Sequence, residues 1–451
     1  MENVEAAYQS TLDYLYSFVD YSLTRSLRYS PEKFDLGRMA VLAAALGSPH
    51  RQYPVVHVAG TKGKGSTSAM IASVLQTAGY KVGLYTSPHL VDYTERIQVN
   101  RQPVSHERLV ELVERLKPEV AKIEQLTTFE LTTAAAFLCF AEEKVDIAVI
   151  EVGLGGRLDA TNIVDPRVSV ITSLSMDHMN VLGDTLEKIA AEKGGIIKPG
   201  RPVVVAHQKP EAAEVLKKIA KERHSPIIFT DDAYFASLTQ HSLAGQEFAI
   251  RPAAKTNGNS RASSFSLPLL GAHQVQNALT AYAALKVLHM TGIKISSASI
   301  YQGFAAVSWP GRFEILQNDP LVVIDSAHNL DSAEKLAQTI RDYLPGQSVG
   351  LVFGASEDKD VTGMLGALSP VIESIMVTQS VHPRSYDAVQ LGEAAQKFGL
   401  PVAVNPQLES ALEQAYANLK PDGALVITGS IFIAAGARQY WFEKKTSLKL
   451  A

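Results

Sequence analysis

Cysteine is almost absent from the sequence: Cys139 is the single one among 451 residues, so the chain cannot form an internal disulfide. Cys139 lies in an apolar run, residues 134–141, where a buried core thiol is the expected state. Scarcity of cysteine is typical of proteins of a reducing compartment. The first residues also lack the basic and apolar regions of a signal peptide. We therefore expect a cytoplasmic protein.

The chain also lacks an excess of either charge. It has 42 Lys and Arg against 46 Asp and Glu, a formal net charge of -4 at pH 7. Because no half is strongly basic, we expect no sequence-independent binding to nucleic acid. No apolar run is long enough to span a bilayer, since Gly429 and Ser430 interrupt the most apolar stretch, residues 424–437. We therefore expect neither nucleic acid nor a membrane as a partner.

The length and the hydrophobic pattern predict two α/β domains. A single core rarely exceeds about 300 residues, so a chain of 451 residues is expected to divide. Pro and Gly interrupt the pattern at residues 308–311, which places the domains at 1–308 and 309–451. Short apolar runs alternate with helical patterns in both, which predicts parallel sheets covered on both faces. The expected strands are residues 55–58, 82–85, 147–150, 168–171, 321–324, 349–353, 374–377, 402–404 and 424–427.

One region departs from this alternation. Two strand-like pieces within residues 246–267 flank the polar cluster at 255–260, which predicts a β-hairpin. Elsewhere the ligands of parallel sheets bind at the carboxyl ends of the strands, so the residues that follow each strand are the candidates for chemistry.

The strongest such candidate is GTKGKGS, residues 60–66, which follows a strand and opens a helix. Glycines let backbone N–H groups approach phosphate, the helix N-terminus favours an anion, and a lysine adds positive charge. The strict P-loop pattern is not met, because Val58 occupies the place of its first glycine and Gly65 follows Lys64. The run predicts a variant phosphate loop in which Lys64 binds phosphate and Lys62 is a loop lysine. The alternative is a glycine-rich turn beside a solvated lysine.

Other segments carry weaker signals. Glu151 ends the strand at 147–150, where a carboxylate can hold Mg²⁺ together with phosphate oxygens. His178 follows the next strand and fits a structural role about as well as a ligand. The pattern alone makes Lys193 an ordinary helix-end lysine that interacts with the helix dipole. Arg312 suits bidentate binding of phosphate or carboxylate, and equally an interdomain salt bridge.

In order and spacing, these segments together resemble the folylpolyglutamate synthases and dihydrofolate synthases of the Mur ligase superfamily. The resemblance covers nearly the whole chain. It implies a P-loop, parallel-sheet ATP-binding domain of the Mur ligase central type at 1–308 and a smaller Rossmann-like ligase domain at 309–451. The matching blocks are residues 60–66, 86–90, 129–130, 151–162, 177–178, 192–198, 273–277, 310–314, 325–329 and 428–430.

The resemblance implies ATP, two magnesium ions and a carbamate formed from CO₂ on Lys193. Lys64, Lys193 and His178 match catalytic positions of the family. The implied ATP-binding residues are Gly60, Thr61, Gly63, Lys64, Gly65, Ser66, Asn277 near the adenine, Arg312, Asp325 and His328. The implied metal ligands are Ser66, Ser87, Glu151, His178 and the carbamylated Lys193. The implied substrate-binding residues are Phe129, which would pack on the pterin ring, Arg157 and Arg384.

The sequence departs from the family pattern at a few positions. Lys62 stands where the family usually has Asn, and Ser326 and Leu330 replace the Gly and Pro of an Asp-Gly-Ala-His-Asn-Pro block. None of these changes removes an implied ligand. Lys62 adds positive charge beside the expected phosphates.

The implied reaction is ATP-dependent addition of L-glutamate to tetrahydrofolate or dihydropteroate, through an acyl phosphate. The enzyme is expected to be a monomer whose domains close about residues 309–312. Two alternatives stay open, a Mur-type peptide ligase acting on a UDP-linked substrate and a non-catalytic nucleotide-binding protein. About fifty residues precede the phosphate loop, too few for an additional UDP-binding domain of typical size. The combination of Glu151, His178 and Lys193 argues against a mere binder.

Overall fold

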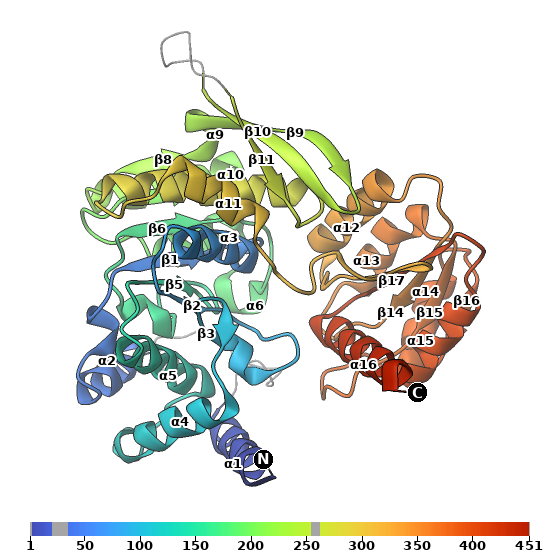
Figure 1. Cartoon of the computed structure of the whole chain (residues 1–451), viewed down its shortest axis with the longest axis horizontal. Helices are drawn as coiled ribbons and strands as arrows, with labels where there is room; N and C mark the ends of the chain where they lie inside the picture. The colour runs from blue at the N-terminus through green and yellow to red at the C-terminus, as the bar shows by residue number, and fades with distance from the viewer. Residues whose placement is uncertain (1, 20–34, 254–261, 451) are drawn as a thin grey trace. The chain divides into compact units, whose positions relative to one another are not determined.

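The computed structural model describes residues 2–19, 35–253 and 262–450, which form two compact units (Figure 1). The first unit comprises Met1–Thr239, Glu247–Leu267 and Gln274–Val307. The second, drawn mostly in orange and red, comprises Ser308–Ala451 together with two short earlier segments. These are Gln240–Gln246 and Pro268–His273, which a single boundary at residue 308 does not describe.

The first unit is built on an eight-stranded sheet with the order β4-β3-β2-β5-β1-β6-β7-β8. The strands from β2 to β8 along this order run parallel, and β3 and β4 are added antiparallel at one edge. The strands are β1 (Val55–Ala59), β2 (Val82–Tyr85), β3 (Ile97–Val99), β4 (Gln102–Pro103), β5 (Ile147–Glu151), β6 (Val168–Ile171), β7 (Val203–Val205) and β8 (Ile227–Phe229).

The central strands are mostly apolar because both faces of the sheet are covered. Every residue of β1 and β5 is buried, as expected for parallel strands between layers of helices. The helices of this unit are α1 (Glu2–Tyr16), α2 (Leu36–Ala45), α3 (Lys64–Thr77), α4 (His106–Val120), α5 (Thr128–Glu142), α6 (Met179–Leu182), α7 (Leu186–Gly194), α8 (Pro210–Glu222), α9 (Thr230–Ala233), α10 (Ala272–Met290) and α11 (Ser297–Ala305). Short 3₁₀ turns lie at Pro49–Arg51, Tyr93–Arg96 and Ala160–Ile163.

A three-stranded sheet has the order β11-β10-β9, formed by β9 (Tyr234–Ser242), β10 (Gly245–Pro252) and β11 (Ser263–Leu267). β10 and β11 are neighbours, as the expected hairpin requires. The polar cluster at 255–260 lies outside the described residues. Phe248 on β10 and Phe265 on β11 are buried and stack with ring centroids 5.5 Å apart, which gives this sheet an apolar face.

The second unit has a six-stranded sheet with the order β12-β13-β17-β14-β15-β16. Only β12 pairs antiparallel, with β13. Its strands are β12 (Glu314–Asn318), β13 (Leu321–Ile324), β14 (Val349–Phe353), β15 (Ser374–Val377), β16 (Val402–Val404) and β17 (Ala424–Thr428). Its helices are α12 (Leu330–Tyr343), α13 (Val361–Leu368), the 3₁₀ turn Ser369–Val371, α14 (Ala388–Gln396), α15 (Leu408–Ala417) and α16 (Ile431–Leu450).

The prediction of an α/β fold with a smaller second α/β domain is confirmed. In the first unit the strand register brings four strand ends to one edge. Val58 of β1 pairs with Glu151 of β5, and Tyr85 of β2 pairs with Ile150. β1 also pairs with β6 on its other side. The segments that follow β1, β2, β5 and β6 therefore start next to one another. No described helix is both long and apolar enough to cross a membrane.

Candidate active site

The phosphate loop, residues 60–66, joins β1 to α3, which begins at Lys64. Gly63 precedes the helix with a left-handed φ of 82°, which favours glycine. A β-carbon at Gly63 would also collide with the side-chain amide of Asn277 on α10. The first N–H groups of a helix have no partner within the helix, so the loop presents backbone donors and Lys64 to an anion.

Asn277 lies directly against this loop. Its amide nitrogen donates to the side-chain oxygen of Gln274, one turn earlier on α10, at 3.0 Å. Gln274 is itself buried. The side-chain amide oxygen of Asn277 is the atom nearest to where a β-carbon of Gly63 would be. The structure thus brings Asn277 to the phosphate loop, and its contact with the adenine stays a prediction.

The segment that follows β6 holds the other side of the loop. The backbone N–H groups of Thr61 and Lys62 both donate to the carbonyl of Ser173, at 2.9 and 3.1 Å. The Thr61 hydroxyl donates to the carbonyl of Ser175 at 3.2 Å. The Lys62 ammonium pairs with the Asp177 carboxylate at 2.8 Å. The loop lysine expected at position 62 is therefore an ion-pair partner across two segments.

Lys193 lies beneath the loop, and the expectation of an ordinary helix-end lysine is wrong. Its side chain is only 4% exposed, and Nζ donates to the Gly60 carbonyl at 2.8 Å. α7 packs tightly there, since a β-carbon on Gly156 would lie 2.8 Å from the Glu192 carbonyl oxygen. Burial, and next the charge of Lys64, lowers the pKa of Lys193 to about 7. A substantial fraction of this amine is therefore uncharged at neutral pH.

Side chains with oxygen atoms that could bind a metal lie at the start of α3 and at the ends of neighbouring strands. Glu151, at the end of β5, is 4% exposed, and one of its oxygens accepts the Ser87 N–H at 3.2 Å. Ser87 follows β2, and Ser66 is buried in the first turn of α3. One buried carboxylate and two hydroxyl groups are the hard oxygen ligands that Mg²⁺ takes together with phosphate oxygens. These residues therefore fit the ion that the sequence predicts.

His178 lies in the segment that follows β6. It is the N-cap residue of α6 with a φ of 50°, and its side chain is about half exposed. Its backbone N–H donates a hydrogen bond to the adjacent carboxylate of Asp177 at 3.0 Å. Within the described ranges no three His, Cys, Asp or Glu side chains are grouped so as to hold a metal by themselves. A metal here would need ligands beyond those side-chain types, which serine hydroxyls and phosphate can supply.

The candidate substrate residues Phe129 and Arg157 lie near the end of β5. The outer end of the Phe129 ring packs against Gly153, where a β-carbon would come within 2.5 Å of Cζ. Arg157 donates to a carboxylate oxygen of Glu192, at 2.9 and 3.1 Å. Its backbone N–H donates to the Glu192 carbonyl at 2.8 Å, so it fastens the start of its loop to α7. Its role in binding substrate stays a prediction.

In the second unit, Arg312, Asp325 and His328 gather around the end of β13. The Asp325 carboxylate accepts the N–H groups of Phe313 and Ala327, both at 2.8 Å. Burial raises the pKa of Asp325, although the Arg312 guanidinium opposes this shift. His328 contacts the Ser326 carbonyl through Nδ1 at 2.9 Å. Asp325 therefore ties together the segments that carry Arg312 and His328 within this unit, and the contact of these residues with the nucleotide stays a prediction.

Arg384 lies in the same unit, after β15. Its guanidinium is 4.0 Å from the Asp358 carboxylate, which also pairs with Lys359 at 3.0 Å. The preceding His382 stacks on Phe432 with ring centroids 3.9 Å apart. The sequence patterns single out neither Lys359 nor His382. Because Lys359 follows closely on the end of β14, the rule of strand ends could have found it.

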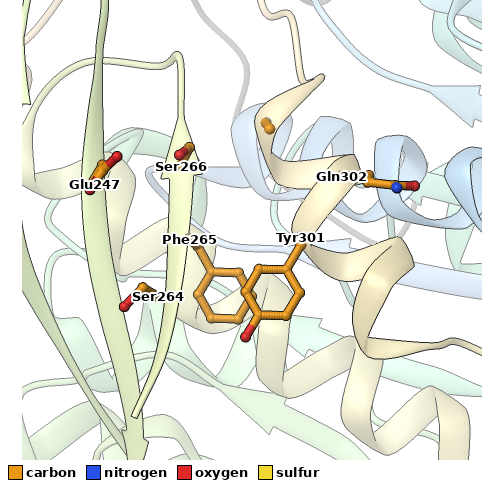
Figure 2. A pocket seen from close by; sticks show the side chains of 7 residues that line it. Glu247, Ser264, Phe265, Ser266, Tyr301 and Gln302 are labelled. Carbon is orange, nitrogen blue, oxygen red and sulfur yellow. The ribbon is translucent and has the colours of Figure 1, made fainter.

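A hollow of the first unit lies on the three-stranded sheet (Figure 2). It is bounded by Glu247 of β10, Ser264 and Ser266 of β11, and residues of α11. Phe265 and Tyr301 stack in it with ring centroids 4.6 Å apart. None of the candidate site residues lines it.

Two protein families match this chain. The Mur ligase middle domain matches residues 58–285, and the Mur ligase glutamate ligase domain matches residues 311–431. The dihydrofolate synthase/folylpolyglutamate synthase of Bacillus subtilis is 38% identical over 433 residues, which cover 94% of this chain and 99% of that protein. The folylpolyglutamate synthase of Lacticaseibacillus casei is 34% identical over 444 residues, which cover 96% and 98% of the two chains.

Solved structures give the same result. The Mycobacterium tuberculosis folylpolyglutamate synthase complexed with ADP matches with a TM-score of 0.87 and 34% identity, covering 97% of this chain and 99% of that one. The E. coli FolC in complex with DHPP and ADP matches with a TM-score of 0.85 and 32% identity, covering 97% and 98%. These matches favour neither a UDP-peptide ligase nor a non-catalytic protein.

Proposed function

This chain belongs to the dihydrofolate synthase/folylpolyglutamate synthase family of Mur ligases, and we propose how its residues join L-glutamate to a folate carboxylate at the expense of ATP. It is an ATP-dependent acid–amino-acid ligase. The observation that carries the proposal is the phosphate loop with the buried Lys193 bonded to its first residue, Gly60, and Glu151 at the adjacent strand end. The residues proposed to bind phosphate and metal and to adjust the local charge therefore lie close together.

The reaction has two steps. The folate carboxylate attacks the γ-phosphorus of ATP, and ADP leaves, which yields an acyl phosphate. The amino group of L-glutamate then attacks the acyl carbon, phosphate leaves, and the nitrogen loses a proton to give the amide. Because a carboxylate and a triphosphate repel each other, Lys64 and the N–H groups of the loop would neutralise charge while holding the reacting atoms in line.

Ser66, Ser87 and Glu151 would hold magnesium, with His178 at the edge of the same group. When bound, magnesium neutralises the phosphate oxygens and orients them. The burial of Glu151 supports this assignment, because a positive ion would offset the cost of burying a carboxylate charge.

We further propose that Lys193 carries a carbamate. Its uncharged amine attacks CO₂, a C–N bond forms as one C=O π bond opens to C–O⁻, and the nitrogen loses a proton, so a neutral amine becomes an anion. The low pKa of about 7 supports this step because only the uncharged amine is a nucleophile. After burial, the charge of Lys64 is the largest influence on the pKa of Lys193 and disfavours a cation there, so the same charge would stabilise the carbamate anion.

The substrates would be divided between two clusters. Phe129, packed on Gly153, offers an apolar face for the pterin ring of a folate or dihydropteroate. Arg384 and Lys359, at strand ends of the second unit, would pair with the two carboxylates of L-glutamate. Arg312, Asp325 and His328 would contact the nucleotide. The protein would act as a monomer, and the buried free thiol of Cys139 supports a location in the cytoplasm.

Product mass spectrometry tests this function. Purified protein is incubated with ATP, Mg²⁺ and L-glutamate, in parallel with dihydropteroate and with tetrahydrofolate. A mass gain of one glutamate on both substrates identifies a bifunctional synthase, and a gain on tetrahydrofolate alone identifies a polyglutamylase. No gain on either substrate, with ADP still bound, would overturn the proposal.

A further inference from the structure

The phosphate loop and the segment after β6 are joined by an ion pair that the proposed reaction does not use. Lys62 and Asp177 are separated by 115 residues, yet their charged groups are 2.8 Å apart. Their side chains are only 18% and 12% exposed. By contrast, the Lys188–Asp184 pair nearby is 62% and 76% exposed and spans one helical turn. The Lys62–Asp177 pair is therefore largely shielded from solvent.

Burial makes separation of the two charges of this pair costly. A shielded carboxylate left without its cation is strongly disfavoured, so the two segments must keep this contact or expose both charges. Three further bonds fix the same arrangement. They run from the backbone N–H groups of Thr61 and Lys62 to the Ser173 carbonyl and from the Thr61 hydroxyl to Ser175. The ammonium of Lys62 is thus directed to Asp177 rather than toward the helix N-terminus that faces the phosphates.

The two carboxylate oxygens of Asp177 contact Lys62 and His178 separately. Oδ2 receives the Lys62 ammonium, and Oδ1 accepts the His178 N–H at 3.0 Å. His178 adopts a φ of 50°, a conformation that residues other than glycine rarely hold without support. No side chain caps the short helix α6 that starts there. The Asp177 carboxylate is therefore a fixed point for the backbone that presents the His178 ring.

We propose that Lys62 is a positioning residue that acts through Asp177 to hold His178 at the magnesium site. The inference rests on the proposed function, which places His178 at that site. Lys62 would not itself bind the nucleotide. Its ion pair holds the phosphate loop against the segment that follows β6, so the residues for the nucleotide and for the metal keep one arrangement.

A double-mutant cycle tests this. K62M, D177N and the double variant are compared with the wild type by calorimetric titration of ADP, with and without Mg²⁺. Each single variant should lower the Mg²⁺-dependent part of the ADP affinity about tenfold, as loss of a residue that orients a ligand does. The double variant should be no worse than either single one, because all three break the same contact. ADP affinity without Mg²⁺ should change less than about twofold.

Two controls accompany the cycle. K62R keeps the cation and should retain the Mg²⁺ effect within about threefold, which separates loss of the pair from misfolding. The exposed pair variants K188M and D184N should leave it unchanged. The role is overturned if K62M weakens ADP binding without Mg²⁺ while D177N does not, which indicates a direct phosphate contact, or if the two effects add. Because ADP binding is the readout, these outcomes are distinct from a failure of the wild type to glutamylate folate.

Discussion

At the scale of single residues, the chemistry depends on charges that the fold removes from water. Lys193 is the clearest case, because a buried lysine without a carboxylate partner is costly unless it loses its proton. The carbonyl of Gly60 accepts its hydrogen bond, but a carbonyl offers only partial charge. Chemical conversion of the amine to an anion would instead complement Lys64. The lysine is thus better suited to modification than to service as a cation.

Substitution of Lys193 tests that role. Lys193→Ala should lower turnover by roughly 10²-fold or more, because a charge near the reacting phosphate is lost. Acetate or another short carboxylate should restore part of the activity by entering the vacated space. Turnover is followed by phosphate release with increasing acetate. Wild-type activity in the variant would refute the carbamate, and Lys188→Ala, on the same helix, serves as the control.

The depressed pKa of Lys193 also predicts how stability changes with pH. In the unfolded chain the lysine keeps its proton up to about pH 10.5, whereas in the folded chain it loses it near pH 7. The unfolded state therefore binds more protons between these values, so the free energy of unfolding rises with pH across this window and this contribution is flat below it. Lys193→Met should flatten the rise.

Urea unfolding at several pH values between about 7 and 9, in CO₂-free buffer, measures this slope. Lys188→Met should keep the wild-type slope, since Lys188 is largely exposed. A Lys193→Met variant whose unfolding free energy rises as steeply as that of the wild type would show that Lys193 does not titrate in this range.

At the scale of elements, the strand ends were predictable and the helix contacts were not. The apolar runs of β1 and β5 identify buried strands, and the rule of carboxyl ends leads directly to the phosphate loop and Glu151. Lys193 could not be found this way. Its burial depends on how closely α7 packs on the loop after β5, which no local pattern records. The partner of Lys62 lies 115 residues away for the same reason.

The close packing of α7 gives an element-scale prediction. A β-carbon on Gly156 would meet the Glu192 carbonyl at 2.8 Å and the Cα of Lys193 at 3.1 Å. Gly156→Ala should therefore push α7 away and lower the free energy of unfolding by about 1–3 kcal/mol. It should also lower turnover by displacing Lys193.

A matched glycine lies in the second unit. Gly366 on α13 has only the Phe398 ring near its missing β-carbon, at 3.5 Å and beyond, so Gly366→Ala should be neutral or stabilising by about 0.5–1 kcal/mol. Urea unfolding of both variants gives the comparison. If Gly156→Ala is as stable as the wild type, the packing argument is wrong.

At the scale of the whole molecule, we propose that the two units divide the substrates. The phosphate loop and Phe129 belong to the first, and the cations Arg384 and Lys359 belong to the second. The repeated alternation of strands and helices predicts the two domains, whereas the substrate residues come only from the family resemblance. It could not indicate that Gln240–Gln246 and Pro268–His273 are counted with the second unit, because that assignment depends on tertiary contacts.

This division predicts separable kinetic effects. Arg384→Ala should raise the KM for L-glutamate about tenfold, the usual effect of losing a hydrogen bond to a charged group, and leave ADP affinity unchanged. Initial rates at varied glutamate and calorimetric titration with ADP measure the two quantities. An unchanged KM for glutamate would remove Arg384 from that site. Arg341→Ala, on α12 of the same unit, is the control.

The central claim is that the folate carboxylate is phosphorylated before the amide forms. Folate substrate labelled with ¹⁸O in the reacting carboxylate tests it directly, with inorganic phosphate analysed by mass spectrometry after turnover. We predict one ¹⁸O atom transferred to phosphate for each amide formed, because the carboxylate oxygen that attacks ATP leaves with the phosphate. Amide formation with unlabelled phosphate would contradict the account.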